Sequence, residues 1–131
     1  MLKSISMTVL TSVLLATTAN AQDMTSADIV ALVKGSTVYM ELSGAGPRGK
    51  GAAIIFYGDD NKAAAKFPNG TAPKATWSTK GNELCTAWDD QPNNPCSSYV
   101  KVGDKINVIN SETKQVRGTV VRVVPGNAEK L

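Results

Sequence analysis

From residue 36 onward, hydrophobic and polar residues follow each other in short runs that turn-forming residues separate. In TVYMELS, residues 37–43, the valine, methionine and leucine share one face of an extended chain, and the tyrosine and glutamate share the other. GAAIIFYG, residues 51–58, is a continuous apolar run, which is typical of a strand buried on both faces or of a barrel wall. Both runs predict β-strands.

Further strand-like runs continue towards the C-terminus, with turns rich in Gly, Asn, Asp and Pro between them. They are KAAAKF, KATWST, LCTAW, SSYVKV, INVIN and QVRGTVVRVV. KAAAKF, residues 62–67, is the weakest and also permits a helical turn. Gly118, inside the last run, indicates a bend or a bulge. The pattern predicts a mainly β fold of about eight short antiparallel strands, forming a small barrel or a sandwich.

The segment before these strands has a helical pattern instead. In MTSADIVALVKG, residues 24–35, the side chains of Ile29, Leu32 and Val33 fall on one face of a helix. Ser26 is suited to be the N-cap, and a glycine ends the run. We expect one short N-terminal helix of about two to three turns, which plugs or flanks the sheet.

The N-terminus is typical of a signal peptide. Lys3 gives a positive start, residues 5–16 are mostly apolar, and Ala-Asn-Ala at 19–21 matches a cleavage site. A membrane-spanning helix needs about 20 apolar residues, and this stretch is shorter. No cysteine lies near the cleavage site that could carry a lipid anchor. We expect a cleaved signal peptide, residues 1–21, and a single small β domain, residues 22–131, that is periplasmic or secreted and not membrane-anchored. The alternative is that the first residues form a buried helix of the domain.

The charge and composition exclude several classes of function. Of the 14 Lys and Arg residues, Lys3 is lost with the leader, which leaves 13 against 11 Asp and Glu and a net charge of +2. This small, evenly spread charge argues against nucleic acid as a partner. The chain has no histidine, so a Ser-His or Cys-His nucleophile and an imidazole metal site are excluded. We expect no enzyme activity, no metal and no cofactor.

Two pairs of neighbouring carboxylates remain as candidates for catalysis. Asp59 and Asp60 lie in GDDN, and Asp89 and Asp90 lie in WDDQPNNP; both segments are typical of turns. The simplest interpretation is that both pairs face water. A calcium site or a carboxylate-dependent hydrolase built on them is the less favoured alternative.

Cys85 and Cys96 are the only cysteines. In an exported chain such a pair predicts a structural disulfide bond. The bond would tie two neighbouring strands together and hold the polar loop between them in shape. A metal site would need further ligands, and a redox pair more often has the spacing C-x-x-C.

GAGPRGKG, residues 44–51, matches seven of the eight positions of a phosphate-binding P-loop. Gly51 replaces the Ser or Thr that binds magnesium, and the run that follows predicts a strand where a P-loop needs a helix. We therefore expect no nucleotide ligand. Arg48 and Lys50 either face water in a flexible hairpin loop or, with the loop amides, bind an anion such as a carboxylate or a phosphorylated sugar.

Two tryptophans flank the hairpin predicted around KGN, and one of them is expected in the core. On the second strand of this hairpin, Leu84, Thr86 and Trp88 share one face. Trp88 also lies at the start of the disulfide loop, beside Asp89 and Asp90. These three residues are a candidate contact with a partner. The alternative is that Trp88 packs over the disulfide.

Several segments of the second half resemble one protein family. They are ATWSTKGNELCTAW, the second cysteine, YVKVGDK and GTVVRVVPGN. Together they resemble a family of small exported proteobacterial proteins classed as a domain of unknown function, family 995, over most of residues 27–131. The resemblance implies a signal peptide, a helix leading into a KGxTVYM-like strand and a Trp–turn–Cys hairpin. It implies no activity, ligand or catalytic residue.

Three functions are compatible with these features. The first, which we favour, is an exported, non-enzymatic binding module that contacts a protein or glycan through the disulfide-bounded loop, in the manner of a protein inhibitor, with residues 44–51 beside it. The second is a small β-barrel carrier of an apolar ligand, with residues 54–57 lining a cavity of about 300 Å³ or more. The third is the carboxylate-dependent hydrolase.

Overall fold

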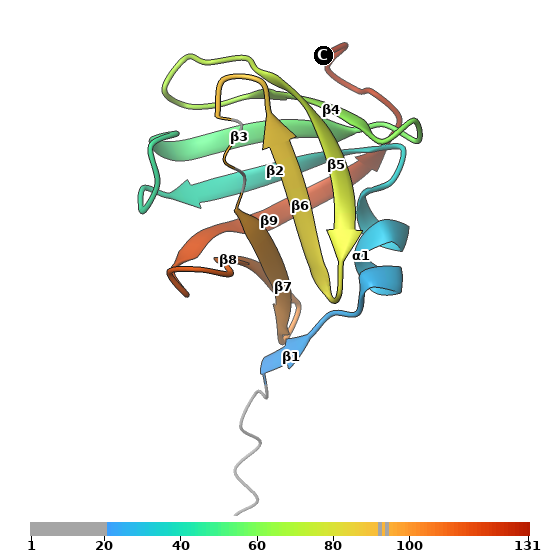
Figure 1. Cartoon of the computed structure of the whole chain (residues 1–131), viewed down its shortest axis with the longest axis vertical. Coiled ribbons are helices and arrows are strands. Elements are labelled where there is room, and N and C mark those ends of the chain that lie inside the picture. The colour runs from blue at the N-terminus through green and yellow to red at the C-terminus, as the bar shows by residue number, and fades with distance from the viewer. Residues whose placement is uncertain (1–20, 92, 94) are drawn as a thin grey trace, which may run out of the picture.

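The computed structural model describes residues 21–91, 93 and 95–131, and eight of its strands form a closed antiparallel barrel (Figure 1). Each strand pairs with the next along the chain, and the last pairs with the first, which closes the ring. The prediction of a mainly β fold is confirmed, and closure decides for a barrel. The strands are β2 (Ser36–Ser43), β3 (Lys50–Tyr57), β4 (Lys62–Lys66), β5 (Lys74–Lys80), β6 (Glu83–Trp88), β7 (Cys96–Val102), β8 (Lys105–Asn110) and β9 (Val116–Pro125).

One further strand, β1 (Ala21–Asp23), pairs antiparallel with β7 outside the ring. The sequence pattern did not predict it, because three residues are too few to show a period. Residues 1–20 of the predicted signal peptide lie outside the described residues. Within the described part of the chain, no helix is long and apolar enough to cross a membrane.

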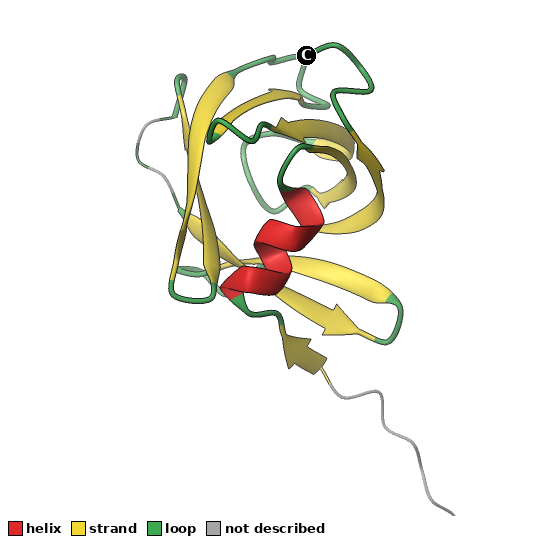
Figure 2. Ribbon diagram, turned by 90° about the vertical axis from the view of Figure 1, so that its right-hand side faces the viewer, coloured by secondary structure: helices red, strands yellow, loops and turns green. Residues whose placement is uncertain are grey.

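The helix α1 (Ser26–Val33) lies across one end of the barrel (Figure 2). The sequence pattern predicted Ser26 as its N-cap, but the N-cap is Thr25. The Thr25 hydroxyl accepts a hydrogen bond from the backbone N–H of Asp28 (3.2 Å), and the Asp28 carboxylate accepts one from the backbone N–H of Thr25 (3.4 Å). Because both side chains take part, this capping box begins the helix one residue earlier than expected.

The helix closes the barrel with apolar side chains. Ile29 and Val33 are fully buried and belong to the same hydrophobic cluster as the inward-facing residues of the strands. The predicted plug is thus observed. β4 is extended rather than helical, and its Ala63 and Ala65 are buried in the same hydrophobic cluster as Trp77.

The up-and-down order of the strands sorts the connections into two groups (Figure 1). The β3–β4, β5–β6 and β7–β8 turns lie at the end that α1 covers, which we call the closed end. The β2–β3, β4–β5, β6–β7 and β8–β9 loops lie at the opposite end, which we call the mouth. The glycine-rich loop and the disulfide loop, which are far apart in the sequence, therefore meet at the mouth.

Candidate functional site

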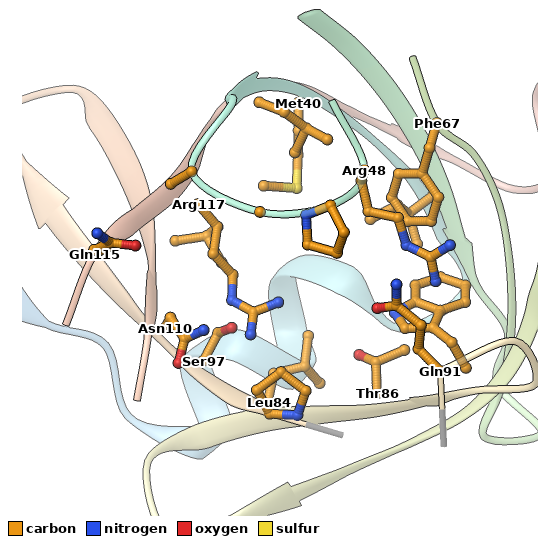
Figure 3. A pocket seen from close by; sticks show the side chains of 18 of the residues that line it. Met40, Arg48, Phe67, Leu84, Thr86, Gln91, Ser97, Asn110, Gln115 and Arg117 are labelled. Atoms are coloured by element: carbon orange, nitrogen blue, oxygen red, sulfur yellow. The ribbon is translucent and has the colours of Figure 1, made fainter. Parts of the chain in front are cut away.

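A cavity of about 210 Å³ opens inside the barrel at the mouth (Figure 3). The side chains that form its wall come from β2, β3 and β6 to β9, and the β2–β3 loop lies across it. The apolar part of the lining is Met40, Leu42, Ile55, Phe67, Leu84, Trp88 and Val108, and the polar part includes Tyr57, Thr86, Ser97, Tyr99, Asn110 and Arg117. The predicted lining by the strand at residues 54–57 is observed for Ile55 and Tyr57.

Arg117 extends from β9 into this cavity (Figure 3). Its direction follows from a β-bulge: Val108 of β8 pairs with Gly118, and Ile109 pairs with Val116, so Arg117 is an extra residue without a partner in the ladder. An extra residue interrupts the alternation of side chains and redirects the side chain it carries. The bend or bulge predicted at Gly118 is confirmed.

Gly118 is required at this bulge for a steric reason. A Cβ atom on Gly118 would lie 2.7 Å from the backbone oxygen of Glu41 and 3.2 Å from a methyl carbon of Leu42. The first distance is shorter than any real contact, and a backbone oxygen cannot move aside as a flexible side chain can. The glycine therefore lets β9 approach β2 where Arg117 enters the cavity.

The guanidinium of Arg117 has no counter-ion among the described residues. Its Nε atom is buried and makes no hydrogen bond, and the one salt bridge found among these residues joins two other side chains. Burial lowers the pKa of Arg117, while Tyr57, Tyr99 and Glu112 act against this shift. Arginine nevertheless stays protonated, so the cavity contains a positive charge that no carboxylate neutralises by contact.

Tyr57 and Tyr99 form the polar floor of the cavity. Both are almost completely buried. Burial raises the pKa of the Tyr57 phenol, and burial together with the neighbouring Tyr57 raises that of Tyr99 well above its ordinary value. Both phenols are therefore neutral at physiological pH. They supply hydroxyl groups but no negative charge to balance Arg117.

Arg48, predicted as an anion-binding residue, is instead paired with Asp90, predicted as a partner contact. The two nitrogen–oxygen distances of this bidentate pair are 2.6 and 2.7 Å. The Arg48 guanidinium also donates to the Thr71 hydroxyl (3.2 Å) and lies 4.5 Å from the centre of the Phe67 ring. The structure thus joins two predicted sites into one internal contact at the rim of the mouth.

The other predicted site residues occupy different places. Trp88 packs edge-on against Phe67, with ring centres 5.2 Å apart, and lines the cavity rather than covering the disulfide. The Asp89 carboxylate accepts a hydrogen bond from the backbone N–H of Lys74 (3.3 Å). Lys50 is exposed at the start of β3. Of the predicted candidates, only Arg48 and Trp88 reach the cavity.

The disulfide bond joins Cys85 of β6 to Cys96 of β7, which lie directly opposite each other in the ladder. It holds these strands together at the point where the β6–β7 loop begins. On the outside of the barrel beside it lies a wider groove of about 710 Å³, lined by polar and charged side chains and by Cys96. This groove is open to solvent, and the described residues that line it include no aromatic or large aliphatic side chain, so it is not the candidate site.

The P-loop and hydrolase interpretations can be tested against the topology. Residues 44–49 connect the antiparallel strands β2 and β3, and residues 50–51 already belong to β3, whereas a P-loop leads from a strand into a helix. Asp59 and Asp60 lie at the closed end and Asp89 and Asp90 at the mouth, so the two pairs cannot converge on one substrate. The described residues contain no cluster of three or more Cys, Asp or Glu suited to a metal ion.

Comparison with protein-family models, with curated protein sequences and with solved structures finds no significant match to this chain. The resemblance to family 995 therefore stays a prediction. The geometry and the charge of the cavity are therefore the guide to its function.

Sequence reasoning missed Arg117 and Tyr99 as residues of the site. In a regularly alternating β9 an arginine next to an inward-facing glycine would point outward, and only the bulge turns it inward. The available signal was the Arg-Gly pair in the middle of an otherwise apolar strand. A charged residue beside a predicted bulge is a reason to examine the interior of a barrel.

Proposed function

We propose that the protein is a non-enzymatic barrel that binds a small molecule in the cavity at its mouth. The observation that carries this proposal is the cavity itself, which is closed below by α1 and the core and is open between the loops. An interior filled by side chains would give a structural domain and no binding site. The N-terminal segment predicts that the protein works in the periplasm or outside the cell, and the disulfide fits an oxidising compartment.

The size of the cavity restricts the ligand. A volume of about 210 Å³ is below the about 300 Å³ at which typical ligand pockets begin. It corresponds to about seven water molecules at roughly 30 Å³ each. The ligand is therefore a compact molecule of about seven to ten non-hydrogen atoms, or a longer one whose end leaves through the mouth.

So small a ligand can still bind usefully. The best small ligands gain about −1.5 kcal/mol per non-hydrogen atom, which allows about −10 kcal/mol for seven atoms. A micromolar dissociation constant requires about −8.2 kcal/mol. A largely preformed cavity helps, because little side-chain entropy is lost on binding.

Binding of a protein or glycan through the disulfide loop is less well supported. Asp90 is held by Arg48, and Trp88 packs on Phe67, so two of the three predicted contact residues serve the rim of the mouth. This interpretation remains a prediction, but no contact between the described residues favours it over the cavity.

Native mass spectrometry of the protein purified from its own cells tests the proposal. We expect a bound molecule of roughly 100–150 Da, which corresponds to about seven to ten non-hydrogen atoms, or a heavier one if its end leaves through the mouth. Ser97 lines the cavity, whereas Ser98, the next residue of β7, lines the outer groove. Ser97→Phe should fill the cavity and remove the bound mass, and the matched control Ser98→Phe should retain it.

If the natural ligand is lost during purification, NMR titration with two probes, benzoate and benzyl alcohol, still tests the proposal. Binding should shift the backbone amide signals of β6, β7 and β9, and Ser97→Phe should suppress the shifts while its circular dichroism spectrum stays that of a folded barrel. The proposal fails if no bound mass is found and neither probe shifts these signals. It also fails if Ser97→Phe binds as well as Ser98→Phe.

A further inference from the structure

We infer that the cavity selects a small organic carboxylate, whose anionic group pairs with the guanidinium of Arg117 and whose apolar body lies against Met40 and Leu84. This inference rests on the proposed function and adds the chemical class of the ligand. It starts from the juxtaposition in Figure 3 of Arg117, which has no counter-ion among the described residues, and apolar side chains such as Met40 and Leu84.

Arg117 has no counter-ion among the described residues. A charge taken out of water is costly unless it is paired and hydrogen-bonded. Arg48, at the same mouth, follows this rule through its bidentate contact with Asp90. Arg117 does not, and its buried Nε has no hydrogen-bond acceptor in the described part of the chain. We infer that the hydrogen-bond acceptor for the Arg117 guanidinium is a ligand from outside the chain.

The composition of the wall also favours an anionic ligand. The described residues that line the cavity include two arginines but neither Asp nor Glu. Glu112, which opposes the lowering of the Arg117 pKa, is exposed on the β8–β9 loop. With Asp90 neutralising Arg48, the cavity keeps one uncompensated positive charge. A ligand with a single negative charge balances it, whereas a cation would be repelled.

The shape of the guanidinium and the rest of the lining restrict the kind of anion that fits. A guanidinium presents two parallel N–H groups, which match the two oxygens of a carboxylate. Thr86 and Ser97 add hydroxyl groups to the lining. The lining also contains apolar side chains, Met40, Leu42 and Leu84 among them, which a purely inorganic anion would leave without contacts. The combination fits a carboxylate with a short apolar body.

The bulge provides an independent reason to regard Arg117 as placed for binding. It interrupts the β8–β9 ladder and requires a glycine at position 118. A regular strand would leave this arginine in water at no cost. Bulges next to sites commonly serve to redirect one side chain.

The test compares matched pairs of acid and alcohol, hexanoate with hexanol and benzoate with benzyl alcohol, by NMR titration of the purified protein. Each acid should bind more tightly than its alcohol. Arg117→Met should weaken binding of the acids about 10- to 100-fold, as expected for a hydrogen bond to a charged group, and leave the alcohols almost unchanged. Arg117→Lys, which keeps the charge, should restore part of the affinity for the acids.

Arg122→Met is the matched control. Arg122 lies on the same strand, but its guanidinium stacks on the outer face of Tyr39, 4.1 Å from the ring centre. Its removal changes the net charge by the same amount as Arg117→Met, so any long-range effect of charge is the same in both variants. Binding of benzoate should be unaffected by Arg122→Met.

Further probes separate the sources of the charged group. Acetate and inorganic phosphate should bind far more weakly than hexanoate, and phosphate binding as tight as hexanoate would overturn the requirement for an apolar body. Dodecanoate tests whether a fatty acid chain can leave through the mouth. An optimum at hexanoate indicates a short acid, and tighter binding of dodecanoate indicates a fatty acid.

The outcomes distinguish this inference from the proposed function. If alcohols and acids bind equally and Arg117→Met changes neither, the cavity binds ligands but is not selective for anions. If Arg48→Met, and not Arg117→Met, abolishes binding of the acids, the charge has been assigned to the wrong arginine. If none of the probes enters the cavity, both proposals fail.

Discussion

The closed end and the mouth of the barrel are built on opposite physical principles. At the closed end Ile29 and Val33 of α1 fill the interior completely, with no exposed surface left on either side chain. At the mouth the same interior widens into a cavity of about 210 Å³ that contains an arginine and two phenols. One end is optimised for stability, and the other keeps space and charge that stability alone does not require.

Two arginines repeat this contrast within the mouth itself. Arg48 is held by Asp90, Thr71 and the ring of Phe67, and it ties the β2–β3 loop to the disulfide loop. Arg117 lies in the same cavity, and its buried Nε has no hydrogen-bond partner in the part of the chain that the structure describes. A satisfied charge supports the structure, whereas an unsatisfied one is a candidate for binding. Proteins commonly accept a local loss of stability at a functional site.

The largest effect is expected at the closed end. Ile29→Ala removes a fully buried side chain and should lower the free energy of unfolding by about 2–5 kcal/mol. Val121, with 65% of its surface accessible, is the control. Val121→Ala should change the free energy of unfolding by no more than about 0.5 kcal/mol. Urea denaturation measures both. Equal changes in the unfolding free energy of the two variants would contradict the role of α1 as the plug.

The disulfide should rank second. Replacing Cys85 and Cys96 by alanine opens the loop at the mouth and should cost about 2–3 kcal/mol of unfolding free energy in the chain-entropy model. Reductant should destabilise the natural protein by a similar amount and leave the double variant unchanged. If the double variant loses as much unfolding free energy as Ile29→Ala, and its NMR signals show that β2 is disordered, then the mouth contributes more to the stability than we infer.

Alkaline pH should reveal the buried phenols of the cavity floor. The pKa of Tyr99 is raised above the ordinary value of 10.0, so its neutral form is favoured in the folded state. Its contribution to stability is therefore complete below the pKa of the unfolded chain and is lost as the pH rises towards the pKa of the folded state. Between about pH 9 and 11, Tyr99→Phe should lose less stability than the natural protein. Urea titrations at several pH values measure this. If Tyr99→Phe and the natural protein lose the same unfolding free energy, the phenol is not buried.

The smallest effect on stability should come from Arg117. Arg117→Met removes a charge without a counter-ion, so the free energy of unfolding should stay the same or rise by about 1 kcal/mol. Arg48→Met should lower it, because the change leaves Asp90 unpaired and removes the contact with Phe67. Thermal unfolding of the two variants side by side measures the difference. A marked loss of stability in Arg117→Met would mean that this arginine is structural.

The sequence predicted the framework of the barrel well. Alternating residues defined β2, and the apolar run of β3 indicated a barrel wall, because both depend on a period that is visible locally. The Cys85–Cys96 bond could also be predicted, since only one pairing exists. Closure of the barrel could not be predicted, because the β2–β9 pairing joins opposite ends of the domain and leaves no local signal.

The site was much harder to predict, and the reason lies in its long-range contacts. Arg48 and Asp90 were both selected as candidates, but their pairing depends on two loops that only the closed barrel brings together. Arg117 was not selected, because its inward direction depends on the register of β8 against β9. Residue types can be read from the sequence, whereas the face on which a residue falls near a bulge cannot.

A crystal structure of the protein with 4-bromobenzoate would test the central claim most directly, since the anomalous signal of bromine locates the ligand without ambiguity. We predict that bromine lies inside the barrel against the apolar wall and that the carboxylate lies within hydrogen-bond distance of Arg117. Bromine found only outside the barrel, at Lys50 or in the outer groove, would contradict the account.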